Sequence, residues 1–169
     1  QTVQLHDVVV NLSDHTVMSL TTHVIHGKGS GPVLFVSAAI HGDEIIGVEI
    51  IRRLASLKAL NRLRGTLILI PIVNAYGFIG LSRYLPDRRD LNRSFPGTET
   101  GSLASQLAFK FMTEIVGVAQ YGIDLHSGAV HRENLPQIRA DLDDPEVLAL
   151  ATAFGASIML NANLLDGSL

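Results

Sequence analysis

The sequence predicts an α/β fold, a mostly parallel sheet with helices on both faces, preceded by an N-terminal β-hairpin. Two observations carry this prediction. Strongly apolar segments, typical of strands buried on both faces, alternate along the chain with segments of helical periodicity. Such alternation is typical of parallel sheets covered by helices. The length of 169 residues, without an evident linker or repeat, indicates one domain over residues 1–169.

The expected elements begin with the hairpin. Two segments rich in Val, Thr and Ile, Val3–Val10 and Thr16–Ile25, are joined by a turn-like stretch at 11–14. A glycine-rich loop then leads to Val33–Ile40, whose nearly continuous apolar run predicts a central strand. In Glu44–Leu60 an apolar residue recurs about every three positions beside basic residues, which predicts an amphipathic helix.

The second half of the chain continues the alternation. Thr66–Val73 is another candidate for a buried strand. Asn74–Gly101 shows little periodicity, and structureless segments of this length are uncommon unless they are functional. The remaining expected elements are a helix at Leu103–Val118 capped by Ser102, a strand at Gly122–Leu125, a helix from Asp144-Pro145 to Phe154 ended by Gly155, and a strand at Ser157–Leu160.

The composition excludes several classes of function. Thirteen Lys and Arg against sixteen Asp and Glu give a net charge of −3, which excludes the strongly basic surface of a nucleic-acid binder. Every apolar run is shorter than the roughly 20 residues that cross a bilayer, and the N-terminus does not resemble a signal peptide. We therefore expect a cytoplasmic protein without membrane attachment. Because there is no Cys, any zinc must be held by His, Asp or Glu. The oligomeric state is left open.

The strongest local signal for chemistry is the segment 41–44, His-Gly-Asp-Glu, directly after the predicted strand Val33–Ile40. At a strand-to-helix corner, this spacing allows the imidazole of His41 and the carboxylate of Glu44 to converge on one cation. His126 ends another predicted central strand, and the carboxyl ends of parallel strands meet at one edge of a sheet. We therefore expect a site with two His and one Glu, whose fourth position stays open as in catalytic zinc sites.

Each of these residues has a structural alternative. A lone His at a strand end is usually a hydrogen-bonded loop residue, and it is the shared sheet edge that favours metal binding here. Asp124 lies two positions before His126 and therefore points to the same face of the strand. Its carboxylate is either a buried structural acid or the acceptor that orients the His126 ring. Structural or solvated roles are expected for His6, His15, His23, His26 and His131.

The long stretch 74–101 is rich in arginine. Guanidinium and amide groups suit a substrate carboxylate, because they offer several N–H donors to its two oxygens. By composition alone, however, most charged loops are merely solvated. Asn74, which follows the second buried strand, is either a loop cap or a pocket wall. The charged and amide candidates in this stretch are Arg83, Asp87, Arg88, Arg89, Asp90, Asn92 and Arg93.

Three blocks of the sequence together resemble a known family. The blocks are HGDE at 41–44, DLNRSFPG at 90–97 and IDLHSG at 123–128. Their order and spacing, over about half of the chain, resemble the succinylglutamate desuccinylase/aspartoacylase family, which is related to the zinc carboxypeptidases. The resemblance implies a carboxypeptidase-like (phosphorylase/hydrolase-like) α/β fold.

The resemblance also implies roles for particular residues. One Zn²⁺ ion is expected to be held by the three candidate ligands, His41, Glu44 and His126. Asn92 and Arg93 are expected to bind the carboxylate end of the substrate. Arg83 resembles a further family arginine near the scissile group, although the spacing after it is longer here.

One element of the family is not found in this sequence. In the family, the glutamate that acts as general base and acid lies on a strand beyond the third block. Glu133 and Glu146 are the glutamates that follow His126, and both fall in polar-loop or helix-start contexts unlike the family position. We therefore expect a fragment, truncated at its C-terminus, that carries the metal half of the site and has little or no activity.

The function that the resemblance implies for the intact protein is zinc-dependent amide hydrolysis. The expected reaction releases an acyl group from an N-acyl amino acid or a similar small carboxylate, and the sequence does not choose the acyl group. A zinc carboxypeptidase acting on peptide C-termini remains an alternative, because it would use the same zinc and the same carboxylate contacts. A non-catalytic zinc-binding domain and a plain α/β domain without a site also remain open.

Overall fold

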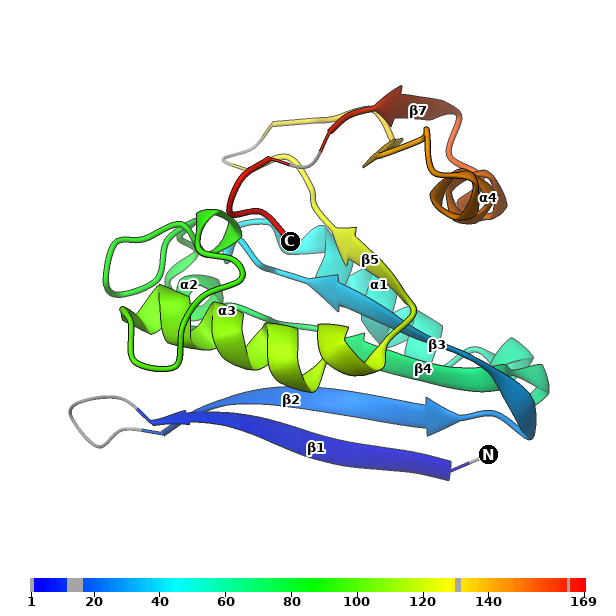
Figure 1. Ribbon diagram of the computed structural model, residues 1–169, viewed down its shortest axis with the longest axis horizontal. Coiled ribbons are helices and arrows are strands. Elements are labelled where there is room, and N and C mark those ends of the chain that lie inside the picture. The colour runs from blue at the N-terminus through cyan, green and yellow to red at the C-terminus, as the bar shows by residue number, and fades with distance from the viewer. Residues whose placement is uncertain (1, 12–16, 130–131, 164) are drawn as a thin grey trace.

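A mixed five-stranded sheet forms the centre of the molecule (Figure 1). The computed structural model describes residues 17–129, 132–163 and 165–169, and the backbone of residues 2–11. In this described part the strand order is β1-β2-β4-β3-β5. Strand β3 pairs in parallel with β4 and β5, whereas β2 pairs antiparallel with β1 and β4. The strands are β1 (Thr2–Asn11), β2 (Val17–His26), β3 (Gly29–Ala38), β4 (Arg64–Ile70) and β5 (Tyr121–Leu125).

The predicted α/β fold with an N-terminal hairpin is confirmed. The hairpin formed by β1 and β2 belongs to the central sheet, because residues 23–26 of β2 pair with residues 66–69 of β4. Its predicted turn falls mostly on residues outside the described part of the chain. The sheet therefore has a parallel half, which carries the candidate site, and an antiparallel half supplied by the hairpin.

Helices cover both faces of the sheet, as predicted. Because side chains alternate along a strand, Phe35 and Val36 of β3 point to opposite faces. Phe35 packs in one buried cluster with Phe111 of helix α3, and Val36 packs in a second cluster with Ile51 of helix α1. No helix in the described residues is long and apolar enough to span a membrane. The helices are α1 (Ile46–Ala55) and α3 (Leu103–Glu114), followed by the short 3-10 helices η1 (Lys58–Arg62) and η3 (Val116–Val118), respectively.

The register between β3 and β5 determines where the candidate ligands lie. Ser37 of β3 stands opposite Asp124 of β5 in the parallel ladder. His41 comes three residues after the end of β3, and His126 directly follows β5. Both histidines therefore leave the sheet at the carboxyl ends of adjacent parallel strands, where ligands bind in open α/β sheets.

The stretch from Asn74 to Gly101 is more ordered than its lack of periodicity predicts. It contains helix α2 (Ala75–Gly80) and the 3-10 helix η2 (Leu91–Arg93). Asn74 is buried, and its side-chain oxygen accepts a hydrogen bond of 2.8 Å from the Gly77 N–H. Asn74 is thus the N-cap of α2, which decides between the two roles considered for it. Both helices are too short for hydrophobic periodicity to reveal them.

The C-terminal part forms a β-α-β unit of its own. Strands β6 and β7 pair in parallel as a two-stranded sheet, and helix α4 connects them. The predicted cap is confirmed, because the Asp144 carboxylate accepts the N–H groups of Glu146 and Val147. The predicted last strand exists as β7, but it pairs with the unexpected strand β6 and not with the central sheet. The elements are β6 (Gln137–Ala140), α4 (Pro145–Phe154) and β7 (Ile158–Asn161).

Candidate functional site

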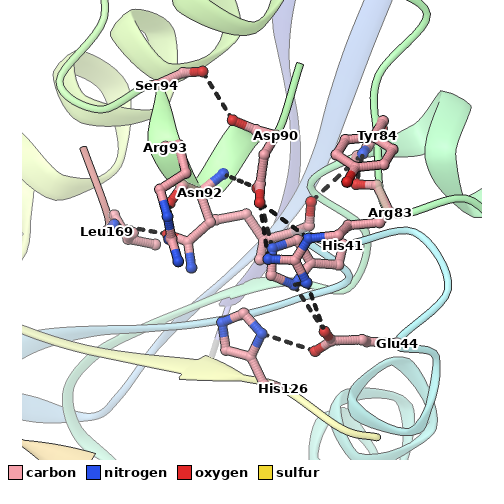
Figure 2. Close-up of polar contacts among 12 residues, drawn as sticks. His41, Glu44, Arg83, Tyr84, Asp90, Asn92, Arg93, Ser94, His126 and Leu169 are labelled. Atoms are coloured by element: carbon pink, nitrogen blue, oxygen red, sulfur yellow. Dashed lines mark hydrogen bonds and ion pairs between the residues drawn. The ribbon is translucent and has the colours of Figure 1, made fainter. Parts of the chain in front are cut away.

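Three side chains converge at the carboxyl ends of β3 and β5 (Figure 2). One candidate ligand atom from each of His41, Glu44 and His126 lies within 4.8 Å of the other two. Nδ1 of His41 is 2.8 Å from Oε1 of Glu44, and Nδ1 of His126 is 2.8 Å from Oε2 of the same carboxylate. The structure therefore brings together all three candidate metal ligands, although Glu44 and His126 are 82 positions apart.

The corner that carries His41 and Glu44 is tightly packed. The Glu44 N–H donates to the His41 carbonyl oxygen at 3.1 Å, which closes a turn between the two residues. At Gly42, a Cβ atom would lie 1.8 Å from the carbonyl carbon of Gly77 in α2. Only glycine allows this close approach, so Gly42 lets the backbone of the corner rest directly on α2.

Two aspartates hold the far sides of the imidazole rings. Nε2 of His41 lies 3.2 Å from Oδ1 of Asp90, and Nε2 of His126 lies 2.8 Å from Oδ2 of Asp124. A carboxylate accepts a hydrogen bond and so favours a proton on the nitrogen that faces it. In both rings the other nitrogen, Nδ1, is directed at Glu44, which makes it the candidate ligand atom for a cation bound beside that carboxylate.

The buried carboxylate of Glu44 is held in its charged form. Burial alone raises its pKa, but hydrogen bonds from His126 and His41, the charge on His126 and the Ser127 N–H lower the pKa well below its usual range. The Ser127 N–H donates to Oε2 of Glu44 at 3.0 Å. A carboxylate that stays ionised is suited to bind a cation.

The His126 ring has the opposite charge in the metal-free chain. Burial lowers its pKa, but hydrogen bonds and charge interactions with Asp124 and Glu44 raise the pKa from 6.5 to about 10. The metal-free site therefore contains an imidazolium between two carboxylates. A divalent cation would take over the role of this positive charge next to Glu44.

The donor set fits zinc. Imidazole nitrogen and carboxylate oxygen are both common zinc ligands, and two His with one acidic residue leave a position for water or substrate. Two further buried oxygens in the same segments, Oδ1 of Asp43 and Oγ of Ser127, have no hydrogen-bond partner among the described residues. Both are therefore available as additional polar groups at this corner.

Arg83 lies next to the three candidate ligands. Its Nη1 is 3.3 Å from Nδ1 of His41 and 3.7 Å from Oε1 of Glu44. Its Nε and Nη2 donate to Oδ2 of Asp90 at 3.0 and 2.8 Å. Asp90 engages two of the three guanidinium nitrogens. The third, Nη1, is directed toward His41 and Glu44 at the corner after β3, which we call the metal corner (Figure 2).

Asn92 and Arg93 lie on the other side of Asp90. The Asn92 N–H donates to Oδ1 of Asp90 at 2.9 Å, which ties η2 to the site. The side-chain oxygen of Asn92 accepts the N–H of Leu169 at 2.9 Å. Arg93 is exposed, and its Nη1 donates to the carbonyl oxygen of Asn92. The structure thus places both predicted carboxylate-binding residues on the loop that also carries Asp90.

Asp90, one of the charged candidates of the long loop, connects the parts of the site, a role that the sequence did not assign to it. Its two oxygens contact His41, Arg83 and the Asn92 N–H (Figure 2). Burial raises its pKa, but the hydrogen bond from Arg83, the charges of His41 and Arg83 and the Asn92 N–H together lower it. The available signal was the position of an Asp two residues before Asn92, which is typical of a turn that the side chain closes.

The other candidates of the long loop have structural positions. Oδ1 of Asp87 accepts the Arg89 N–H and Oδ2 accepts the Ala104 N–H in the first turn of α3, so Asp87 supports the loop and the start of that helix. Arg88 and Arg89 are exposed, and within the described part of the chain neither forms a hydrogen bond or ion pair with the three candidate ligands.

Among the remaining histidines and glutamates, His26 and Glu146 form hydrogen bonds away from the three candidate ligands. Nδ1 of His26 contacts the Thr66 hydroxyl at 3.0 Å. His15 and His131 and the side chain of His6 lie outside the described residues. Glu146 accepts the Tyr121 hydroxyl at 3.2 Å, and Tyr121 begins the strand that ends before His126. Glu146 is therefore bound at the opposite end of β5.

The chain is similar in sequence and structure to several known proteins. N-alpha-acetyl-L-2,4-diaminobutyric acid deacetylase of Halomonas elongata is 33% identical over 135 residues, which cover 76% of this chain and 40% of that protein. A succinylglutamate desuccinylase/aspartoacylase of Rhodobacter sphaeroides superposes with a TM-score of 0.82 at 27% identity, covering 95% of this chain and 51% of its own. The product-bound ectoine utilization protein EutE of Ruegeria pomeroyi gives 0.83 at 27% identity, with coverages of 98% and 53%.

A more distant likeness extends the comparison at the level of the fold. A metallo-carboxypeptidase of Burkholderia cenocepacia superposes with a TM-score of 0.74 at 15% identity, which shows a shared fold alone. The chain spans about half the length of the solved relatives and less of the curated one. The family model of the succinylglutamate desuccinylase/aspartoacylase catalytic domain matches residues 30–167. The chain therefore belongs to the succinylglutamate desuccinylase/aspartoacylase family.

Proposed function

We propose that the chain provides the metal-binding part of a zinc-dependent amide hydrolase that acts on N-acyl amino acids or similar small carboxylates. The observation that carries this proposal is the convergence of His41, Glu44 and His126 within 4.8 Å at one sheet edge. These residues would hold the ion through two imidazole nitrogens and one carboxylate. When bound there, zinc supplies a Lewis acid for an amide carbonyl and activates water at neutral pH.

The protein's own contribution begins with the orientation of the ligands. Asp124 and Asp90 hold Nε2 of the two imidazole rings and so keep Nδ1 directed at the site. Partners of this kind fix the tautomer and the ring orientation of metal-binding histidines. Because both rings are constrained before metal binds, little reorganisation is needed to bind the ion.

Arg83 is proposed to bind the substrate close to its amide group. Asp90 engages Nε and Nη2 of the guanidinium, so Nη1 remains the donor that is directed at the metal corner. A fixed guanidinium stabilises negative charge that develops on an oxygen during acyl transfer. The ion pair with Asp90 thus positions Arg83 without occupying the donor that a substrate would use.

Asn92 and Arg93 are proposed to bind the substrate carboxylate. Both offer N–H donors on the loop next to Asp90, and a carboxylate is an acceptor of hydrogen bonds. The deacetylase of Halomonas elongata, whose name describes an acetylated amino acid as its substrate, supports this substrate class. The proposal covers the amino acid part of the substrate and does not choose the acyl group.

We also propose that proton transfer needs a carboxylate other than those described at the site, including Asp43, whose Oδ1 is buried and unpaired within the ranges that the structure describes. Glu44 is engaged by both histidines, Asp90 by Arg83, and Asp124 by His126 and the Ser37 hydroxyl. A general base must reach the proton that it removes and cannot be fully occupied by other partners. Residues 1–169 alone are therefore expected to bind zinc and to show little or no hydrolysis.

Metal analysis of the purified chain tests the metal site. We expect about one zinc ion per chain, with loss of the ion in His41→Ala and in His126→Ala. The matched control is His26→Ala, because His26 is exposed and contacts Thr66 outside the site. Unchanged zinc content in the two ligand variants would refute the metal site.

Substrate assays on the full-length protein test the reaction. Zinc-dependent cleavage of N-acyl amino acids supports the proposal. Cleavage of C-terminal peptides alone would favour the carboxypeptidase alternative, for which the shared fold with the Burkholderia cenocepacia protein is the supporting observation. Zinc binding without turnover of either substrate class would favour a non-catalytic zinc-binding domain.

A further inference from the structure

The segment 165–169 is fixed on the loop that carries Asn92. The Phe95 N–H donates to the Gly167 carbonyl oxygen at 3.0 Å. The Leu169 N–H donates to Oδ1 of Asn92 at 2.9 Å (Figure 2). The Leu169 side chain packs against the core cluster that contains Phe95. Three contacts thus hold the segment in place, although more than 70 positions separate it from the loop.

Gly167 allows the segment to lie this close. Its φ of +79° is in the left-handed region, which favours glycine. A Cβ atom at this position would lie 2.7 Å from the Arg93 carbonyl oxygen. The backbone of the segment therefore rests directly on the backbone of Arg93, next to the side chain of Asn92.

The hydrogen bond from Leu169 determines how the Asn92 amide is oriented. A backbone N–H can only donate, so Asn92 must present its oxygen to Leu169. The amide group is planar, and its NH2 group must then point to the other side. No hydrogen-bond partner for Nδ2 of Asn92 is found within the described ranges, so this donor is available to a ligand.

The orientation of the Asn92 amide matters because a carboxylate can bind to its NH2 group but not to its oxygen. An ionised carboxylate only accepts hydrogen bonds, so it is attracted by an NH2 group and repelled by an amide oxygen. If the Asn92 amide turned over, its oxygen would face the ligand and its NH2 group would face the Leu169 N–H, leaving both contacts unfavourable. The contact with Leu169 excludes this arrangement.

We propose that the backbone N–H of Leu169 is a positioning group, which orients the Asn92 amide so that its NH2 group donates to the substrate carboxylate. This inference rests on the carboxylate-binding role of Asn92 in the proposed function. It assigns to the segment 165–169 a part in substrate binding that neither the three sequence blocks nor the metal corner indicates.

Titration of the ¹⁵N-labelled chain with N-acetylglycine, followed by NMR, tests the proposal. The Asn92 side-chain NH2 signals are expected to shift with N-acetylglycine and not with N-acetylglycinamide, which lacks the carboxylate. Leu169→Pro removes the N–H donor and is expected to raise the Kd for N-acetylglycine about two- to tenfold, as loss of one hydrogen bond does. Leu169→Ala keeps the N–H and is the matched control, with a Kd close to that of the wild type.

Asn92→Asp separates the two functions of the amide. Its carboxylate still accepts the Leu169 N–H, so the exchange protection of that amide proton is expected to remain. It has no donor for the ligand and carries a like charge, so binding of N-acetylglycine is expected to be lost.

The outcomes distinguish the inference from the proposal on which it rests. An unchanged Kd in Leu169→Pro, in a chain whose wild type binds N-acetylglycine, would overturn the inference and leave the carboxylate site intact. Failure of the wild type to bind N-acetylglycine through Asn92 would overturn the carboxylate site itself, and the inference with it. The amide spectrum of each variant shows whether its fold is preserved.

Discussion

Ser37 and Asp124 face each other across the parallel ladder of β3 and β5, and the Ser37 hydroxyl donates a hydrogen bond of 2.7 Å to Oδ1 of Asp124. The second oxygen of Asp124, Oδ2, lies 2.8 Å from Nε2 of His126. Ser37 is fully buried, so water does not compete for this contact. The pairing register of two strands thus fixes the orientation of a candidate metal ligand.

Asp124→Asn is expected to weaken zinc binding by about 10- to 100-fold, because the His126 ring loses a charged partner that orients it. Ser37→Ala is expected to weaken binding less, because Asp124 keeps its contact with His126. A competition titration with a zinc-binding dye measures both affinities. Ser56→Ala is the control, since the exposed Ser56 hydroxyl donates to the Arg52 carbonyl oxygen, away from the site. Wild-type zinc affinity in Asp124→Asn would contradict the orienting role.

Zinc binding is expected to release a proton from His126. Its pKa of about 10 in the metal-free chain means that the ring is charged at neutral pH, whereas a metal ligand must be neutral. Affinity should therefore rise about tenfold per pH unit below pH 10, with about one proton released per ion. Calorimetry in buffers of different ionisation enthalpy counts this proton.

The same pKa predicts how the stability of the metal-free chain depends on pH. Because the pKa of His126 is raised on folding, its stabilising contribution is complete below pH 6.5 and is lost as the pH rises through about 10. Asp124→Asn removes the strongest cause that raises this pKa, and it should reduce both the proton release and the pH dependence. If the wild type and Asp124→Asn released the same number of protons on zinc binding, Asp124 would not be the cause of the raised His126 pKa.

Asp90→Asn is expected to destabilise the metal-free chain by about 1–3 kcal/mol at neutral pH, the usual effect of losing hydrogen bonds between charged groups. The pKa of Asp90 is lowered on folding, so its contribution is present above its ordinary value of 3.8 and is lost as the pH falls through the lowered pKa. Urea unfolding at pH 7 and near pH 3 should therefore show a smaller difference between variant and wild type in acid. The control is Glu99→Gln, a change at an exposed residue, for which we expect the same stability as the wild type at both pH values.

The sequence allowed the metal corner to be predicted because its signals are local. Two apolar strands each end in a polar block, and parallel strands place such ends together. The distances between the side chains did not follow from the sequence, because they depend on the register between β3 and β5.

Contacts that depend on the path of an irregular loop were missed. Asp90 joins His41 and Arg83 through side chains that are 49 and 7 positions away, and no periodicity marks such contacts. The contact of Leu169 with Asn92 is made by a backbone N–H, for which residue identity carries no signal. Strand β6 has four residues and pairs with β7, so its pattern is too short to predict.

Two glycines of the same region provide a matched test of the packing at the metal corner. A Cβ atom at Gly42 would lie 1.8 Å from the carbonyl carbon of Gly77 and 2.2 Å from the Phe78 nitrogen, and backbone atoms cannot move aside as a flexible side chain can. At Gly80, the last residue of α2, a Cβ atom would meet nothing within 4 Å.

Gly42→Ala is therefore expected to lower the free energy of unfolding by several kcal/mol, on the order of the largest effects of single substitutions, because α2 must move away from the corner. Zinc affinity should fall as well, because His41 and Glu44 flank Gly42 and move with it. Gly80→Ala should change stability by less than about 1 kcal/mol and leave zinc binding unchanged, because helix propensity is the main property that it alters. Urea unfolding and zinc titration of both variants measure these effects. Equal stability of Gly42→Ala and Gly80→Ala would show that the corner does not rest on α2.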